Sequence, residues 1–123
     1  MDPIELVKAQ DRTIPPAGQT PGMVREQAFV SEDIWSGVVF TDPGMISGWH
    51  HHGEHDTYFY VASGRAVLEF GPGGRDRVEA DSHDFIHVPK HTVHRESNPS
   101  DETSTLIVFR MGSGDVVVNV EGP

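Results

Sequence analysis

The histidines of this chain are the residues whose type and spacing most directly indicate chemistry. All eight lie between positions 50 and 94 of the 123 residues, and four of them fall within the six residues from His50 to His55. Because the cluster is internal, it is not a terminal affinity tag. A single histidine on a strand is usually bonded to a backbone carbonyl or to water, but neutral imidazole is also a common metal ligand. The clustering predicts a site for a divalent transition-metal ion (Fe, Mn, Ni, Cu or Zn), and the ligands alone do not select among these.

Strand geometry singles out three of these histidines. Side chains alternate between the two faces of a strand, so His50 and His52 would share one face, about 6–7 Å apart, while His51 would point the other way. The later segment TVHRES supplies His94 on the same face as Glu96. We therefore predict His50, His52 and His94 as the metal ligands. Because carboxylates on strands usually face water, Glu96 is considered only as a candidate general base.

Short strands separated by turn formers make up most of the chain. Thirteen glycines and nine prolines punctuate segments rich in Val, Ile, Phe and Thr. Turn signals at intervals of about ten residues are typical of β-sandwiches and barrels. The sequence predicts one all-β domain over residues 1–123, with about ten strands and little helix. The expected strands span residues 34–40, 45–51, 57–63, 65–71, 76–80, 84–89, 92–97, 104–111 and 115–120.

The composition excludes several other classes of protein. A formal net charge of −10 at pH 7 repels phosphate backbones and anionic headgroups, so we expect no nucleic acid and no membrane surface as partners. The absence of cysteine excludes disulfides, thiolate catalysis and iron–sulfur clusters. The start of the chain has early acidic residues, and no stretch approaches the roughly 18 apolar residues of a membrane span. We expect a cytoplasmic protein that binds a small molecule.

Two stretches of the chain resemble the motifs of a known family. Residues 43–64, PGMISGWHHHGEHDTYFYVASG, resemble the first motif of the cupin superfamily, and residues 83–98, HDFIHVPKHTVHRESN, resemble the second. The resemblance implies a single-domain cupin, a double-stranded β-helix barrel of the jelly-roll type, with a metal ion held inside one end by both motifs. It places His50 and His52 on the paired histidines of the first motif and His94 on the histidine of the second. The structural positions of the motifs are matched by Gly44, Gly64, Pro89 and Asn98.

The chain departs from the cupin pattern at three positions. Thr57 stands where the first motif has a glutamate, and His83 and His91 stand where the second motif usually has glycines. A neutral hydroxyl is a poor ligand for a divalent ion, so we expect a three-histidine site with water in the fourth position. The alternative is a fourth ligand from the nearby turn, with His55 as the main candidate. The other candidates in this turn are Asp56 and Glu54.

Strand alternation also selects residues that would line a pocket beside the metal. If Thr57 faces inward, Phe59 does so too, and both are pocket candidates together with His87. For His87 the simpler interpretation is a hydrogen-bonded histidine of the barrel wall. Arg65 and Arg95 are the nearest candidates for binding an anion, although arginines usually lie at the solvated surface.

The predicted function follows from the charge of the site and from the resemblance. Three neutral imidazoles leave a divalent ion with its full charge, which would attract a small organic anion. Three-histidine cupin sites resemble those of oxygenases acting on diketones, gentisate-like rings and thiols, so a dioxygenase-like, metal-dependent enzyme is the first prediction. A metal-dependent isomerase, epimerase or lyase is the alternative, as is a non-catalytic cupin that only binds a small ligand.

Residues 1–30 are predicted to form an N-terminal arm with edge strands. The segment MVREQAFVSEDIW alternates enough to add a strand to a partner's sheet. An open sheet edge is an aggregation liability, so pairing with a second copy is physically reasonable. We expect a homodimer.

Overall fold

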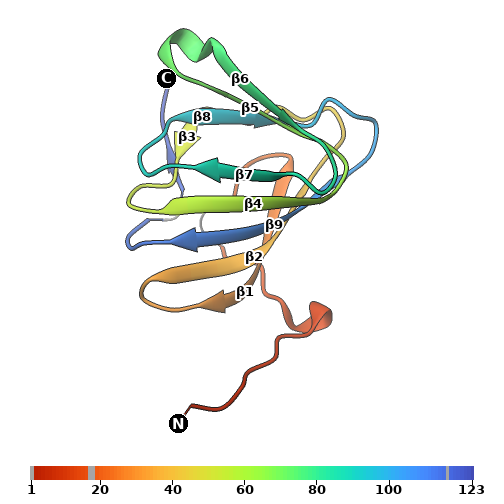
Figure 1. The fold of residues 1–123 in the computed structure, drawn as a ribbon, viewed down its shortest axis with the longest axis vertical. Coiled ribbons are helices and arrows are strands. Elements are labelled where there is room, and N and C mark those ends of the chain that lie inside the picture. Colours follow the sequence, from red (N-terminus) through yellow and green to blue (C-terminus); the bar gives the residue numbers. More distant parts are fainter. Residues whose placement is uncertain (1, 17–18, 116) are drawn as a thin grey trace.

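Ten strands form two antiparallel sheets in the computed structural model, which describes residues 2–16, 19–115 and 117–123 (Figure 1). The first sheet has the order β1-β2-β9-β4-β7, and the second has the order β10-β3-β8-β5-β6. The strands of the first sheet are β1 (Met23–Val30), β2 (Ile34–Thr41), β9 (Ser104–Met111), β4 (Asp56–Ser63) and β7 (Phe85–Val88). Those of the second are β10 (Val118–Asn119), β3 (His50–His51), β8 (His94–Ser97), β5 (Ala66–Phe70) and β6 (Asp76–Ala80). The all-β prediction is confirmed.

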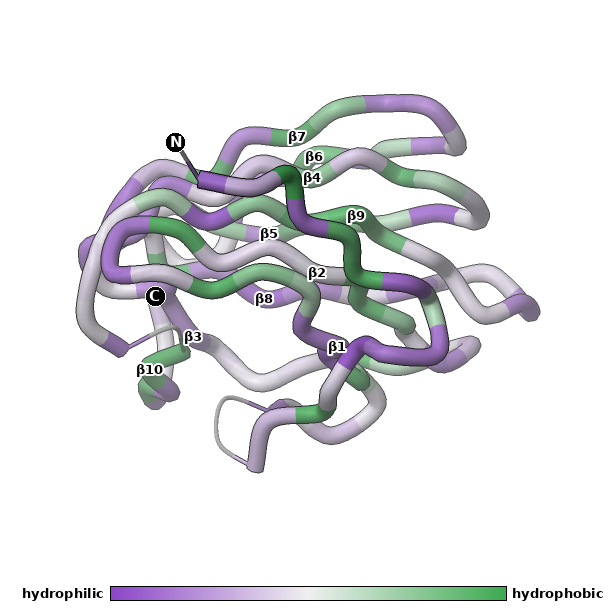
Figure 2. Tube along the Cα trace, turned by 90° about the horizontal axis from the view of Figure 1, so that it is seen from below, coloured by the Kyte–Doolittle hydropathy of each residue, from purple (hydrophilic) through white to green (hydrophobic). Residues whose placement is uncertain are grey.

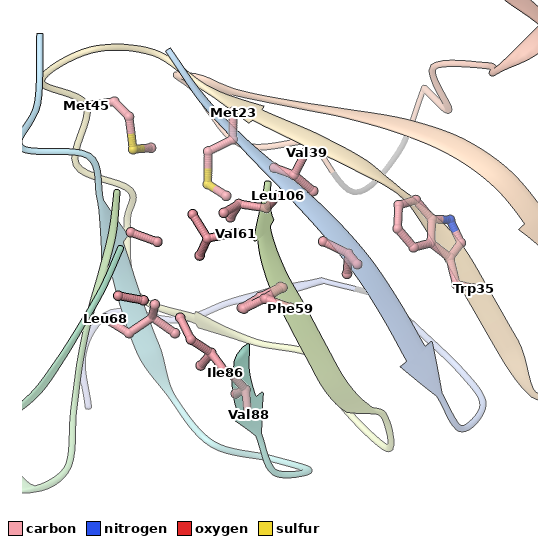
Figure 3. Packing of buried hydrophobic residues seen from close by; sticks show 13 residues of the cluster. Met23, Trp35, Val39, Met45, Phe59, Val61, Leu68, Ile86, Val88 and Leu106 are labelled. Carbon is pink, nitrogen blue, oxygen red and sulfur yellow. The ribbon is translucent and has the colours of Figure 1, made fainter. Parts of the chain in front are cut away.

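The core lies between the two sheets and follows from the alternation of side chains along the strands. In β4, Thr57, Phe59 and Val61 are buried, while the intervening residues are exposed or half-buried. β9 pairs with β4 and alternates in the same way. Figure 3 shows the resulting apolar cluster, in which Met23 and Met45 lie at one side and Trp35 lies apart from them. The polar members of the inward faces are therefore held inside the barrel by the same alternation.

Irregular segments connect the strands. The part of the chain that the structure describes has two short 3-10 helices, η1 (Ala9–Asp11) and η2 (Pro72–Gly74), the second lying in the β5–β6 hairpin. Within the described residues, no helix has the length and apolar character that crossing a membrane requires. Gly64, between β4 and β5, adopts φ +84. A Cβ at this position would overlap the backbone and side chain of Ser104.

Two of the expected strands are much shorter than predicted. In segment 45–51 only β3 is a regular strand, beside an isolated bridge between Ile46 and Ser97. The Ser47 hydroxyl accepts the hydrogen bond of the Glu96 amide at 2.9 Å, so a side chain replaces a regular backbone partner there. In segment 115–120 only β10 is a strand, and residue 116 lies outside the described residues.

The N-terminal region pairs within its own chain. β1 is an edge strand that pairs with β2, and its free side is bridged by Thr13 at Gln27. The residues before η1 extend away from the barrel (Figure 1), and in Figure 2, seen from below, they run in front of the strands. Ile4 and Leu6 in this extension are exposed.

Candidate metal centre

Four buried side chains converge inside the barrel. His50 lies on β3, His52 directly follows it, and His94 and Glu96 lie on β8, which pairs with β3 through His50 and His94. One ligand atom from each of the four lies within 4.8 Å of the others. The ring centroids of the three histidines are 4.5–5.1 Å apart. The structure thus brings together the three histidines that the sequence pattern selects, and it adds a carboxylate.

Backbone carbonyls orient two of the imidazoles. His50 Nδ1 lies 3.0 Å from the carbonyl oxygen of Gly48, and His94 Nδ1 lies 2.9 Å from that of Thr92. A carbonyl can only accept a hydrogen bond, so Nδ1 carries the proton in both rings. In the neutral rings, Nε2 then presents its lone pair to the centre of the group. Histidines that bind metal ions in proteins are commonly held in position by such a bond at the other ring nitrogen.

The carboxylate of Glu96 faces these lone pairs. Its Oε1 lies 3.2 Å from His94 Nε2 and 3.8 Å from His50 Nε2. Burial alone would raise the pKa of Glu96, but the hydrogen bond with His94 and the surrounding positive charge outweigh burial and lower this pKa to about 2. Burial lowers the pKa of His50 to about 4. At neutral pH this pair therefore offers an anionic oxygen and a neutral imidazole, the forms that bind a metal ion.

Glu96 was not among the metal ligands selected from the sequence, which favoured water or a residue of the turn after His52 beside the three histidines. The structure places Glu96 in the group. The turn residues have other partners. His55 Nδ1 lies 2.8 Å from the carbonyl oxygen of His52, Asp56 pairs with His87 at 3.0 Å, and Glu54 pairs with His91 at 2.7 Å. The feature of the sequence that could have indicated Glu96 as a ligand is its position on the same strand face as His94.

The pocket candidates fall into two locations. Thr57 and Phe59 are buried inside the barrel, and Phe59 belongs to the apolar core. His87 lies on the outer side of the first sheet, where it stacks on Tyr58 and bonds to Asp56. A cavity of about 80 Å³ reaches His94. Its other lining residues are mainly apolar, namely Leu68, Phe70, Val78, Ile86, His87, Val88, Pro89 and Thr92.

Two arginines lie inside the barrel, and neither was among the anion-binding candidates from the sequence. Arg25 on β1 and Arg110 on β9 are each 1% exposed. Arg25 donates to Thr20 Oγ1 at 2.9 Å, and the guanidinium of Arg110 lies 4.9 Å from the centroid of the Trp35 ring. The candidates Arg65 and Arg95 instead lie at the surface, in ion pairs with Asp81 and Glu69.

The two histidines at the glycine positions of the second motif have a left-handed backbone. His83 has φ 79 and His91 has φ 58, the two positive values among the described non-glycine residues. Histidine visits this region more often than most residues, although at an energetic cost relative to glycine. The backbone shape that glycine normally permits is therefore retained here. His83 bonds to Tyr60 Oη at 2.7 Å, and His91 pairs with Glu54.

Comparison with solved structures places this barrel in a known fold. A double-stranded β-helix protein of Klebsiella pneumoniae matches with a TM-score of 0.73 at 18% identity, covering 97% of this chain and 99% of that one. KdgF from Halomonas sp. matches with a TM-score of 0.69 at 20% identity, covering 89% and 94%. The oxalate decarboxylase of Bacillus subtilis, which has Mn(II) centres, matches with a TM-score of 0.71 at 23% identity. The match covers 88% of this chain and 30% of the decarboxylase chain. The predicted double-stranded β-helix is confirmed.

At the level of sequence, no curated protein matches the chain. The family described as "Cupin domain" matches residues 37–110. This span runs from within β2 to the second-to-last residue of β9, and it includes all four side chains of the candidate metal centre. The chain belongs to the cupin family.

Proposed function

We propose that this cupin binds one divalent transition-metal ion through His50, His52, His94 and Glu96 and uses it to act on a small organic anion. The observation that carries the proposal is the contact between Glu96 and His94. Because Nδ1 of His94 donates to a carbonyl, a neutral ring has only a lone pair to offer the ionised carboxylate 3.2 Å away. A proton on His94 Nε2 would satisfy only these two atoms, whereas a metal ion would supply positive charge to all four residues of the group.

The residues of the site suit such an ion and its chemistry. A bound divalent ion would act as a Lewis acid that polarises an oxygen of the substrate. The carbonyls of Gly48 and Thr92 hold the rings of His50 and His94 in the orientation that leaves Nε2 inward. Burial of the group limits competition from water and strengthens electrostatic interactions. The apolar cavity beside His94 favours a substrate with a small apolar part.

The reaction class remains a prediction. A dioxygenase-like reaction is the first candidate. That prediction was based on a resemblance to oxygenase centres with three histidines, whereas the group in this structure also contains a carboxylate. A second candidate is an isomerase, epimerase or lyase, in which the ion polarises a carbonyl of the substrate. Oxygen uptake by the metal-loaded protein with diketones, hydroxylated aromatic acids and thiols tests the first candidate. Product formation without oxygen supports the second.

Metal content tests the proposal directly. We expect close to one divalent ion per chain, by elemental analysis, after purification without chelator or affinity tag. His94→Ala should remove most of this metal, because the site loses one of its ligands. His87→Ala is the matched control, since the Nε2 atom of His87 bonds to Asp56 and His87 is not one of the four converging residues. Failure of the wild-type protein to take up Fe, Mn, Ni, Cu or Zn would leave a cupin that only binds a small ligand.

We also propose that the protein is a homodimer that associates through the outer face of the first sheet. On this face Tyr58 opposes Phe109, and Tyr60 opposes Phe85. Phe85 is 78% exposed, and Tyr58, Phe109 and Met111 are also exposed. Neighbouring exposed aromatic side chains of this kind favour an interaction surface. The arm is a weaker candidate, since β1 already pairs with β2.

A further inference from the structure

Arg110 has hydrogen-bonding capacity that its surroundings do not use. It is 1% exposed, and its Nε and Nη1 atoms have no hydrogen-bond partner among residues 2–16, 19–115 and 117–123. Stacking on Trp35 satisfies the face of the guanidinium but not its N–H groups. A buried charge without hydrogen-bond partners costs several kcal/mol. Packing alone therefore does not account for this arginine.

A second unused polar group lies next to it. Thr57 is paired with Arg110 across β4 and β9, and both side chains point into the barrel. Directly opposed residues have Cβ atoms about 4.5–5.5 Å apart. Thr57 Oγ1 is buried and also lacks a hydrogen-bond partner within the described residues. A hydroxyl and a guanidinium thus face the same part of the interior.

The charge of the interior favours an anion at this place. The charged side chains buried within the described residues are Arg25, Arg110 and Glu96, apart from the histidines. Positive charge exceeds negative charge by one before any metal ion is counted. Burial, with a smaller contribution from Arg25, lowers the pKa of Arg110 to about 9, so its guanidinium remains charged at neutral pH.

The pair lies near one end of the barrel. Thr57 is the second residue of β4, and Arg110 is the second-to-last residue of β9, so both lie near the same end of the sheet. A shallow depression lies over this end and includes Lys90. Its other lining residues are Asp33, Ile34, Asp56, Met111 and Gly112.

We infer that Arg110 and Thr57 bind the carboxylate group of an organic acid, with the candidate metal centre beside it. The inference rests on the proposed function, because it specifies the anionic group of the substrate. Arginine donates to carboxylates through paired, charge-assisted hydrogen bonds, and the threonine hydroxyl supplies another donor. A carboxylate fits better than a phosphate, because the second negative charge of a phosphate would be repelled by Glu96.

Acetate binding provides the test, with acetamide as its neutral analogue. Ligand-observed NMR titrations are run on chelator-treated protein and on Mn(II)-loaded protein, and the metal content of each variant is measured separately. We expect acetate to bind in both forms and acetamide not to bind. Arg110→Met should weaken acetate binding at least about tenfold, and Thr57→Val about threefold to tenfold, since the latter removes one hydroxyl from a site of unchanged shape. Arg77→Met, in an exposed ion pair with Glu79, should have no effect.

The outcomes separate this inference from the proposed function. Arg110-dependent acetate binding without metal uptake would support the inference and overturn the metal-dependent function. Normal metal uptake with acetate binding unchanged in Arg110→Met would overturn the inference alone. If Arg110→Met does not fold, the variants Thr57→Val and Arg110→Lys are used instead. Both should weaken acetate binding, and wild-type affinity for acetate in both would overturn the inference. Tighter binding of inorganic phosphate than of acetate would also overturn it.

Discussion

Glu96 contributes the negative charge of the four-residue group. Its amide is held by the Ser47 hydroxyl, and its own carbonyl accepts the amide of Ser47 at 2.8 Å. These contacts fix the backbone from which the carboxylate reaches His94. An anionic ligand adds electrostatic attraction to the bond it makes with a divalent ion.

Replacing this carboxylate should weaken metal binding more than replacing a neighbouring one. We expect Glu96→Gln to lower the affinity for Zn or Mn by at least about tenfold, as measured by competition with a chromophoric chelator. Glu69→Gln is the matched control, because Glu69 lies on the adjacent strand β5 and pairs with Arg95. An unchanged affinity in Glu96→Gln would instead favour the three-histidine site with solvent.

Some residues of the site could be predicted from sequence and others could not. The H-x-H spacing placed His50 and His52 on one face, because that depends only on strand alternation. The role of Glu96 depends on the separation between distant strands, which spacing along the chain does not determine. Arg25 and Arg110 were missed because charged residues are rarely fully buried. From sequence alone, any one arginine is therefore expected at the surface.

At the scale of elements, the turn between β4 and β5 depends on a glycine. Gly64 has φ +84 and contacts Ser104, whose hydroxyl bonds to both the amide and the carbonyl of Arg65. We expect Gly64→Ala to lower the free energy of unfolding by about 1–3 kcal/mol, from backbone strain and the clash with Ser104. Urea denaturation measures this change.

Gly48 offers the matched control for this substitution. A Cβ there would meet no atom within 4 Å, and its φ is not in the left-handed region. Gly48→Ala should therefore change the free energy of unfolding by no more than about 0.5 kcal/mol. Equal stability of the two variants would mean that the turn tolerates a side chain at Gly64.

The long strands β4 and β9 were predictable, whereas the two shortest, β3 and β10, were not. β4 and β9 have continuous alternation, and each was predicted within one residue of its observed bounds. Segment 45–51 has similar residue types, but there the hydroxyl of Ser47 and the Nδ1 atom of His50 both bond to the nearby carbonyl of Gly48. Such side-chain contacts compete with regular pairing and shorten the strand.

For the whole molecule, the exposed aromatic face should govern association. We expect the wild-type protein to have the mass of a dimer by light scattering at micromolar concentration. Phe109→Glu should give a monomer, because it places a charge among Tyr58 and its neighbours in the proposed interface. Val78→Glu is the control, since Val78 is similarly exposed but lies on β6 of the other sheet. A wild-type monomer, or a dimer that persists in Phe109→Glu, would argue against this interface.

β3 is only two residues long and pairs with β8 through a single position, yet it provides His50 and leads into His52. Two of the four proposed ligands thus depend on one of the least extensively paired segments of the second sheet. Segments of this kind open locally at a lower free energy than the long strands do. A ligand that binds only the closed form suppresses such opening, by about 2.7 kcal/mol at a hundred times its dissociation constant. Amide hydrogen exchange near β3 and β10 should therefore slow on metal addition, while exchange in β4 and β9 stays unchanged.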